Sequence, residues 1–161
     1  MNLFIKLHPK SLAWYISEKD FGVVQVSKSF KVSSGLFYKL IKGITDRHKD
    51  IVNVIIEKPY LRLNGDDRKR LARDIIHIQR LFGSLLSWLE YFFPAAEIIQ
   101  LSARVARKSA YNTESISKDQ QLSEIAVILP SVKQLDYCTI ELFCIHDCLV
   151  LKRAYEQRSA R

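Results

Sequence analysis

The class of fold follows from one stretch of the chain, Ile51-Val52-Asn53-Val54-Ile55-Ile56, which is its strongest strand signal. Nearly all of these side chains are β-branched, and β-branched side chains pack well on a pleated sheet. A continuous apolar run, unlike an alternating one, is typical of a central strand that is covered on both faces. The stretch therefore predicts an α/β protein with helices on both sides of its sheet.

The residues before this strand predict three shorter strands and a helix. Residues 3–7, 12–16 and 23–26 are largely apolar, and short polar segments separate them. Strands spaced so closely favour an antiparallel meander. Apolar residues then recur at the three- and four-residue spacing of a helix, at Leu36, Phe37, Leu40, Ile41 and Ile44.

The residues after it predict a long helix, a last strand and three more helices. The long helix begins near Asp66-Asp67 and is ended by Pro94, and the strand covers residues 97–101. Further helices are predicted at residues 103–110, at residues 118–129, and from about Ser131 past Tyr155. This order predicts a single α/β domain over residues 1–161, with a five-stranded mixed sheet flanked by helices.

The composition favours one globular domain with a polyanionic partner. Of the 161 residues, 48% are hydrophobic and 26% are charged, and the formal net charge is +8. This charge favours nucleic acid as the partner before an anionic membrane surface. No window approaches the ~20 apolar residues of a membrane-spanning helix, and the first residues lack the features of a signal peptide.

The cysteines indicate the compartment. There are three of them, Cys138, Cys144 and Cys148, and they lie close together in the chain. An odd number in one short stretch does not resemble a disulfide framework. We therefore expect a reducing compartment, which means a cytoplasmic protein, associated with the nucleoid if it is cellular.

Two carboxylates occupy positions that suit metal-dependent chemistry on phosphodiesters. Such chemistry commonly uses divalent metals held between carboxylates, and Mg²⁺ prefers oxygen ligands. Glu57 directly follows the strongest strand, and Asp147 lies inside the apolar stretch 142–151. A carboxylate in such a stretch is costly unless it is paired, metal-bound or hydrogen-bonded. The alternatives are a solvated glutamate at a strand end and an aspartate that pairs with a nearby base.

The start of the chain carries a family resemblance. Ile5-Lys6-Leu7-His8-Pro9-Lys10, followed by Ala13-Trp14, resembles the opening of the RuvC-type Holliday junction resolvases, which have an RNase H-like fold. In that family the first strand ends in an aspartate, often followed by Pro-Gly, and here His8 stands at the aspartate position. The second acid of the family ends the fourth strand and has an aromatic residue three positions later, and Glu57 and Tyr60 match this pair.

Later segments extend the resemblance from about Asn2 to Tyr155. Gln79-Arg80-Leu81-Phe82-Gly83, Ser117-Lys118-Asp119-Gln120 and Asp147-Cys148-Leu149-Val150 are similar to three further segments of the family, in the same order. The resemblance implies a metal-dependent, structure-selective endodeoxyribonuclease of four-way junctions that acts as a two-fold dimer. Cys144 stands three residues before Asp147, where the family has an acid or a histidine.

These departures predict a degenerate catalytic site. Glu57 and Asp147 remain from the four expected ligands, and His8 is a candidate third metal ligand, although imidazole suits Mn²⁺ or Zn²⁺ better than Mg²⁺. His146 is a further catalytic candidate, but it projects roughly 100° away from Asp147 around an ideal helix. Cys144 is a poor ligand for Mg²⁺. The expected cofactor is Mg²⁺ or Mn²⁺ if the site is active, and none otherwise.

Basic and aromatic residues form the candidate nucleic-acid interface. Cations at phosphates provide affinity without reading sequence, and an aromatic ring beside Glu57 can stack on an unpaired base. The candidates are Lys58, Tyr60, Arg62, Arg104, Arg107, Lys108 and Lys118. The alternative is that the cations form an ordinary solvated helix face and that Tyr60 packs on the fold.

The long helix also predicts self-association. Between Ile75 and Phe93 it is apolar on more than one face, which exceeds what one buried stripe requires. We expect part of it to form a homodimeric or heteromeric interface, which suits a two-fold junction. The alternative is a helix that is buried on both sides within the domain.

Three hypotheses about function follow. The first is a RuvC-like DNA-binding protein that recognises branched or four-way junction DNA in recombination and repair, with impaired or lost nuclease activity. The second is an active, metal-dependent Holliday junction endonuclease with a rebuilt metal site. The third is a structural or protein-interaction subunit of a nucleic-acid-processing complex.

Overall fold

The computed structural model describes residues 1–59 and 68–160, and for residues 68–71 it describes only the backbone. A mixed sheet of five strands lies at the centre of the molecule, in the order β3-β2-β1-β4-β5. The strands are β1 (Asn2–His8), β2 (Ser11–Ser17), β3 (Asp20–Gln25), β4 (Asn53–Lys58) and β5 (Glu97–Ser102). The first three pair antiparallel, whereas β4 pairs parallel with both β1 and β5. The predicted five-stranded mixed sheet with an antiparallel meander is confirmed.

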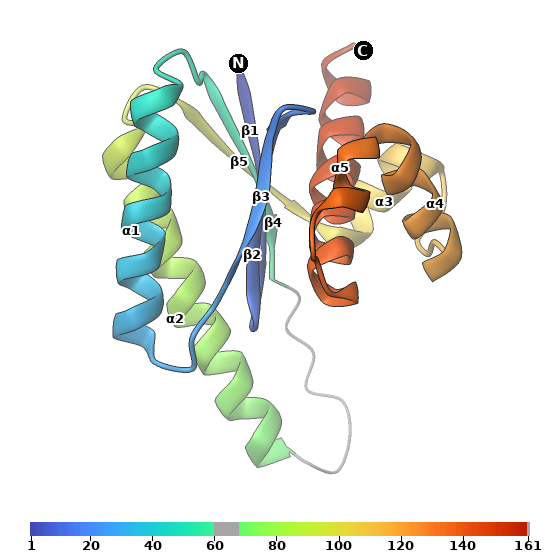
Figure 1. Cartoon of the computed structure of the whole chain (residues 1–161). Coiled ribbons are helices and arrows are strands. Elements are labelled where there is room, and N and C mark those ends of the chain that lie inside the picture. The colour runs from blue at the N-terminus through green and yellow to red at the C-terminus, as the bar shows by residue number, and fades with distance from the viewer. Residues whose placement is uncertain (60–67, 161) are drawn as a thin grey trace.

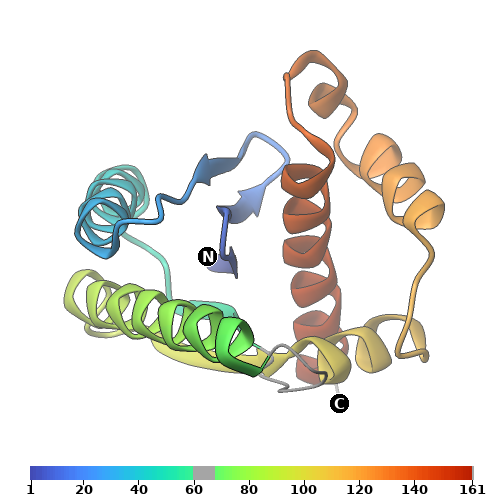
Figure 2. The same cartoon turned by 90° about the horizontal axis from the view of Figure 1, so that it is seen from below.

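Helices cover both faces of this sheet, as Figures 1 and 2 show. Helices α1 (Phe30–Arg47) and α2 (Arg68–Phe92) lie side by side on one face. The opposite face carries α3 (Ala103–Tyr111), α4 (Lys118–Ile128), a 3-10 helix η1 (Pro130–Gln134) and α5 (Thr139–Ser159). The architecture is therefore a three-layer α/β arrangement.

Strand β4 explains why both layers form. Its side chains alternate between the two faces, so that Val54 and Ile56 pack in the core under α1 and α2, while Ile55 packs in the core under α5. All three are fully buried. The predicted burial of this strand on both faces is confirmed.

The final helix begins later than the sequence pattern indicated. The prediction of a continuous helix from about Ser131 is wrong, because η1 ends at Gln134 and α5 begins at Thr139. The backbone N–H of Cys138 donates to the Glu141 carboxylate over 2.8 Å, which satisfies a donor at the start of α5. The helix then packs against β1 and β2, and Asp147 lies within it.

One further property concerns membranes. Within residues 1–59 and 68–160, no helix has both the length and the apolar character that crossing a bilayer requires.

Candidate functional site

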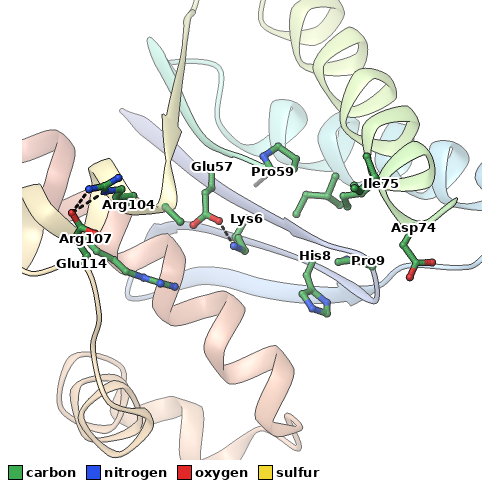
Figure 3. Close-up of a pocket in the computed structure, with 13 residues that line it drawn as sticks. Lys6, His8, Pro9, Glu57, Pro59, Asp74, Ile75, Arg104, Arg107 and Glu114 are labelled. Carbon is green, nitrogen blue, oxygen red and sulfur yellow. Dashed lines mark hydrogen bonds and ion pairs between the residues drawn. The ribbon is translucent and has the colours of Figure 1, made fainter. Parts of the chain in front are cut away.

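The site is built first from two adjacent parallel strands. Ile5 of β1 lies opposite Ile56 of β4 in the parallel register, so Lys6 and Glu57 are the next pair along. Both side chains project toward the α5 face, because side chains on a strand alternate with a period of two. The Lys6 ammonium forms an ion pair and a hydrogen bond with the Glu57 carboxylate, which Figure 3 shows as a dashed line.

Two helices complete this cluster. From α5, the Asp147 carboxylate places Oδ2 3.2 Å from Lys6 Nζ. From α3, Arg107 places Nη2 3.5 Å from Asp147 Oδ1. We call Lys6, Glu57, Asp147 and Arg107 the carboxylate centre. Its two carboxylates face two cations, so the formal charge of the centre is zero.

Burial makes these pairings strong. The side chains of Lys6, Glu57 and Asp147 are only 15%, 7% and 13% exposed. Burial by itself lowers the pKa of Lys6, but the charges and hydrogen bonds of Asp147 and Glu57 outweigh it and raise that pKa above its ordinary value. The ammonium therefore stays protonated throughout the physiological range.

A cavity of about 630 Å³ opens beside the centre. Strands β1 and β4, helix α2 and helix α3 all contribute to its wall, through Lys6, Leu7, His8, Pro9, Glu57, Pro59, Asp74, Ile75, Ile78, Ala103, Arg104, Arg107 and Glu114. Figure 3 shows Arg104 and Arg107 on one side of it and Asp74 and Ile75 of α2 on the other. Arg104 is neutralised by Glu114, whose Oε1 lies 2.7 Å from Arg104 Nη2.

His8 lines this cavity, further along β1 than Lys6 (Figure 3). Its ring Nδ1 accepts a hydrogen bond from the backbone N–H of Lys10 over 3.2 Å. Burial lowers the pKa of His8, and the charges of Lys6 and Lys10 lower it further. The imidazole is therefore neutral at pH 7, next to the carboxylate centre but with no ion pair to either carboxylate within the described part of the chain.

The other two candidates, His146 and Cys144, have partners of their own. His146 is fully buried, with Nε2 3.1 Å from Glu124 Oε2 and 3.4 Å from the Tyr111 hydroxyl. Cys144 Sγ lies 3.3 Å from Ser11 Oγ, and burial raises the pKa of this thiol to about 11. The structure thus brings Glu57 and Asp147 together and leaves His146 with a different set of groups.

Comparison with solved structures identifies the fold of this chain. The Thermus thermophilus RuvC structure matches with a TM-score of 0.64 and 12% identity, over 99% of this chain and 95% of that one. This chain has the RuvC-like fold. The T. thermophilus RuvC in complex with Holliday junction substrate matches with a TM-score of 0.66 and 11% identity, over 99% and 94% of the two chains.

A third solved structure also matches the fold of this chain. The yeast mitochondrial Holliday junction resolvase Ydc2 matches with a TM-score of 0.67 and 13% identity, over 99% of this chain and 78% of that one. No protein-family model matches the chain, and no curated protein matches its sequence. These matches confirm the expected resemblance to the RuvC-type resolvases at the level of the fold.

The carboxylate centre of this RuvC-like fold does not suit a divalent metal. Among residues 1–59 and 68–160, no group of three or more His, Cys, Asp or Glu side chains is arranged to hold a metal ion. A hard divalent cation needs several oxygen ligands with an excess of negative charge. Here Lys6 binds both carboxylates and Arg107 approaches the second.

The candidate DNA contacts are distributed around the same RuvC-like fold. Arg104 and Arg107 line the cavity, each near a carboxylate. Lys58 is exposed at the end of β4, Lys108 is exposed on α3, and Lys118 is exposed at the start of α4. Two candidates, Tyr60 and Arg62, lie outside the described residues.

Lys6 is the functional residue that the sequence analysis missed. It is the only residue with a full charge between Asn2 and His8, in a strand that is otherwise mostly apolar. A cation in a buried strand requires a carboxylate partner. That requirement was a usable signal that Lys6 has a carboxylate partner elsewhere in the fold.

Proposed function

We propose that this protein binds branched DNA, in particular four-way junctions, and that its carboxylate centre has lost metal-dependent cleavage. The observation that supports the loss of cleavage is that the Lys6 ammonium contacts both Glu57 and Asp147. It occupies the space between the two carboxylates that a bound cation would need. The first part is supported by the fold, the net charge and the cations around the cavity.

The chemistry of the ammonium explains the loss of cleavage. Phosphodiester hydrolysis with divalent metals depends on a cation that activates water and stabilises the leaving oxygen. A lysine ammonium provides one positive charge and three hydrogen-bond donors, but no coordination position for water. Lys6 therefore pairs with both carboxylates and offsets the negative charge that a divalent metal would need.

DNA binding does not require this chemistry. Phosphate contacts depend on positive charge and are sensitive to salt, and the protein carries a formal net charge of +8. One protein with this fold is RuvC in complex with Holliday junction substrate. A chain with the same fold and a basic surface can retain junction binding after the metal site is lost.

The same proposal includes a homodimer, because an aromatic cluster lies at the surface of the α1–α2 layer. Ring centroids of Tyr38 and Trp88 lie 5.0 Å apart, and those of Tyr91 and Phe92 also lie 5.0 Å apart. Tyr91 is 69% exposed. Sedimentation should show a dimer that Tyr91→Glu weakens, whereas a monomer at every concentration would contradict this part.

The experiment for the main proposal is a gel assay with a labelled four-way junction and a linear duplex of matched length. We expect tighter binding of the junction, to the same extent in EDTA, Mg²⁺ and Mn²⁺, without cleavage in any of the three. The competing hypothesis of an active endonuclease predicts cleavage that Glu57→Gln abolishes. The hypothesis of a protein-interaction subunit predicts no salt-sensitive binding of either DNA.

A designed gain of metal binding tests the role of Lys6 directly. Lys6→Asp replaces the ammonium with a third carboxylate, and a ligand that binds only the folded state raises stability. We expect Mn²⁺ to raise the melting temperature of Lys6→Asp and to leave the wild-type protein unchanged. Lys6→Asn is the matched control, because it removes the ammonium without adding negative charge. An equal Mn²⁺ response in the wild-type protein would contradict the proposal.

A further inference from the structure

A second cavity lies apart from the carboxylate centre, toward the C-terminal ends of α3 and α5. Its volume is about 760 Å³. We call it the α3–α5 hollow, and it is lined by Lys108, Ser109, Ala110, Tyr111, Asn112, Arg153, Gln157 and Arg158. None of these residues lines the cavity of the carboxylate centre. Figure 1 shows α3 and α5 on the same side of the sheet, where they pack against each other.

The hollow has a one-sided charge. Three of its lining residues are cations, Lys108, Arg153 and Arg158, and none is a carboxylate. All three are exposed, and none forms an ion pair with any residue in the described part of the chain. The arginines of the first cavity differ in this respect, because Arg104 faces Glu114 and Arg107 faces Asp147.

Helix dipoles explain only part of this charge. Lys108 and Arg158 lie in the last turns of α3 and α5, where a cation offsets the partial negative charge of a helix end. Each helix end amounts to about −0.5 of an elementary charge. Three full positive charges against two such ends leave an excess of about +2. Arg153 lies more than one turn before the end of α5 and needs another explanation.

Arg153 is held in place by an aromatic ring. Its guanidinium carbon lies 4.8 Å from the centroid of the Tyr111 ring. Tyr111 is fixed in turn, because its hydroxyl donates to the Glu124 carboxylate and its ring stacks on His146 at an interplanar angle of 16°. A guanidinium held over a ring loses less conformational freedom when it binds an anion. The hollow is therefore preorganised for an anionic ligand.

From these observations we infer that the α3–α5 hollow binds the phosphodiester backbone of a DNA arm, with Arg153, Arg158 and Lys108 as its phosphate contacts. This inference rests on the proposed DNA binding and adds a second contact site to it. Arginine suits phosphate because its planar donors bind two oxygens at once. Asn112 and Gln157, which also line the hollow, add amide donors. Contacts of this kind carry affinity but no sequence preference.

The two cavities are spaced for one continuous nucleic acid. Arg104 lines the first cavity and Tyr111 lines the hollow, both on helix α3. The rise along a helix is about 1.5 Å per residue, which places these two residues about 10 Å apart along α3. That distance corresponds to about three base-pair steps of 3.4 Å each. Both cavities therefore lie within the length of one short segment of duplex.

The test is the salt dependence of four-way junction binding by the full chain. The slope of log affinity against log salt is about −0.9 per phosphate contact. We expect Arg153→Gln/Arg158→Gln to make the slope shallower by about 1.8, because two phosphate contacts are lost. Between 50 and 200 mM salt, the affinity of the variant should then fall by a factor about tenfold smaller than that of the wild-type protein. Lys108→Gln/Arg158→Gln leaves the Tyr111–Arg153 stack intact and should give a similar change, so loss of that stack cannot explain both results.

A matched control removes two cations elsewhere. Lys31 and Lys39 are exposed on α1, on the opposite face of the sheet, and Lys31→Gln/Lys39→Gln should leave the slope unchanged. If the wild-type protein binds junctions and the hollow variants keep its slope, this inference fails and the proposed function stands. If the wild-type protein binds no junction at all, the proposed function itself fails.

Discussion

The carboxylate centre and the α3–α5 hollow use the same residue types in opposite ways. In the centre, Lys6 and Arg107 face two carboxylates, and the charges cancel in a largely buried cluster. In the hollow, Arg153 and Arg158 face solvent without a carboxylate among the described residues. The comparison teaches that the surroundings of a cation decide its role. A buried cation between carboxylates stabilises the fold, and an exposed one without a partner is available to a ligand.

The largest effect should come from removing the buried ammonium. Lys6→Met leaves Glu57 and Asp147 close together without their shared partner. Loss of one partner from a buried ion pair costs about 3–5 kcal/mol. We therefore expect a loss of that size in the free energy of unfolding, measured by urea denaturation at pH 7. A loss below about 1 kcal/mol is typical of an exposed ion pair. It would mean that the ion pairs of the carboxylate centre stabilise the fold no more than surface pairs do.

The pH dependence of Lys6→Met sharpens this prediction. Burial raises the pKa of Glu57, and in the wild-type protein Lys6 opposes that rise. Without the ammonium, the folded-state pKa of Glu57 lies further above its unfolded value, so the folded state binds more protons. Linkage then requires that the variant gains stability as the pH falls through that raised pKa toward the ordinary value of an unfolded glutamate. Urea denaturation at several pH values checks this direction.

A smaller effect is expected at the half-exposed edge of the centre. Arg107 is 31% exposed and lies 3.5 Å from Asp147. Arg107→Gln should cost about 1 kcal/mol or less in the free energy of unfolding, since solvent screens such a pair. It should also weaken junction binding, because Arg107 lines the cavity. A cost as large as that of Lys6→Met would mean that the Arg107–Asp147 pair contributes as much stability as the buried ion pairs of Lys6.

The hollow should contribute least to stability. Lys108→Gln/Arg158→Gln removes two exposed cations, and surface substitutions usually change stability by about 0.5 kcal/mol or less. Thermal melts of this variant should therefore resemble those of the wild-type protein while its junction binding becomes less sensitive to salt. A clear loss of stability would mean that these cations hold the two helix ends and are not free for DNA.

The smallest effect concerns His8. Burial lowers the pKa of its imidazole, and the charges of Lys6 and Lys10 act in the same direction. An NMR titration should therefore give a pKa below about 6.5, the ordinary value. In Lys6→Met one of the positive charges is gone, so the His8 pKa should rise toward that value. An unchanged pKa would show that Lys6 does not influence His8.

Much of the fold could be predicted from local patterns. The apolar run through Ile55 indicated a strand covered on both faces. A strand with one exposed face would alternate apolar and polar residues, and this run does not. Glu57 and Asp147 were recognised as candidates because each carboxylate follows or interrupts an apolar segment. The structure brings these two together at Lys6. The start of α5 was missed, although Cys138 and Glu141 have the spacing of a capping box.

The sequence by itself determined the order of the elements, the charge of the protein and the two carboxylates, since these depend on composition and on spacing along one segment. Only the tertiary structure decided that Lys6 meets both carboxylates, because the parallel register of β1 and β4 joins residues 51 positions apart. It also decided that α3 and α5 bring Lys108 and Arg153 to one hollow. Contacts between distant segments depend on packing, and no local pattern along the chain contains that information.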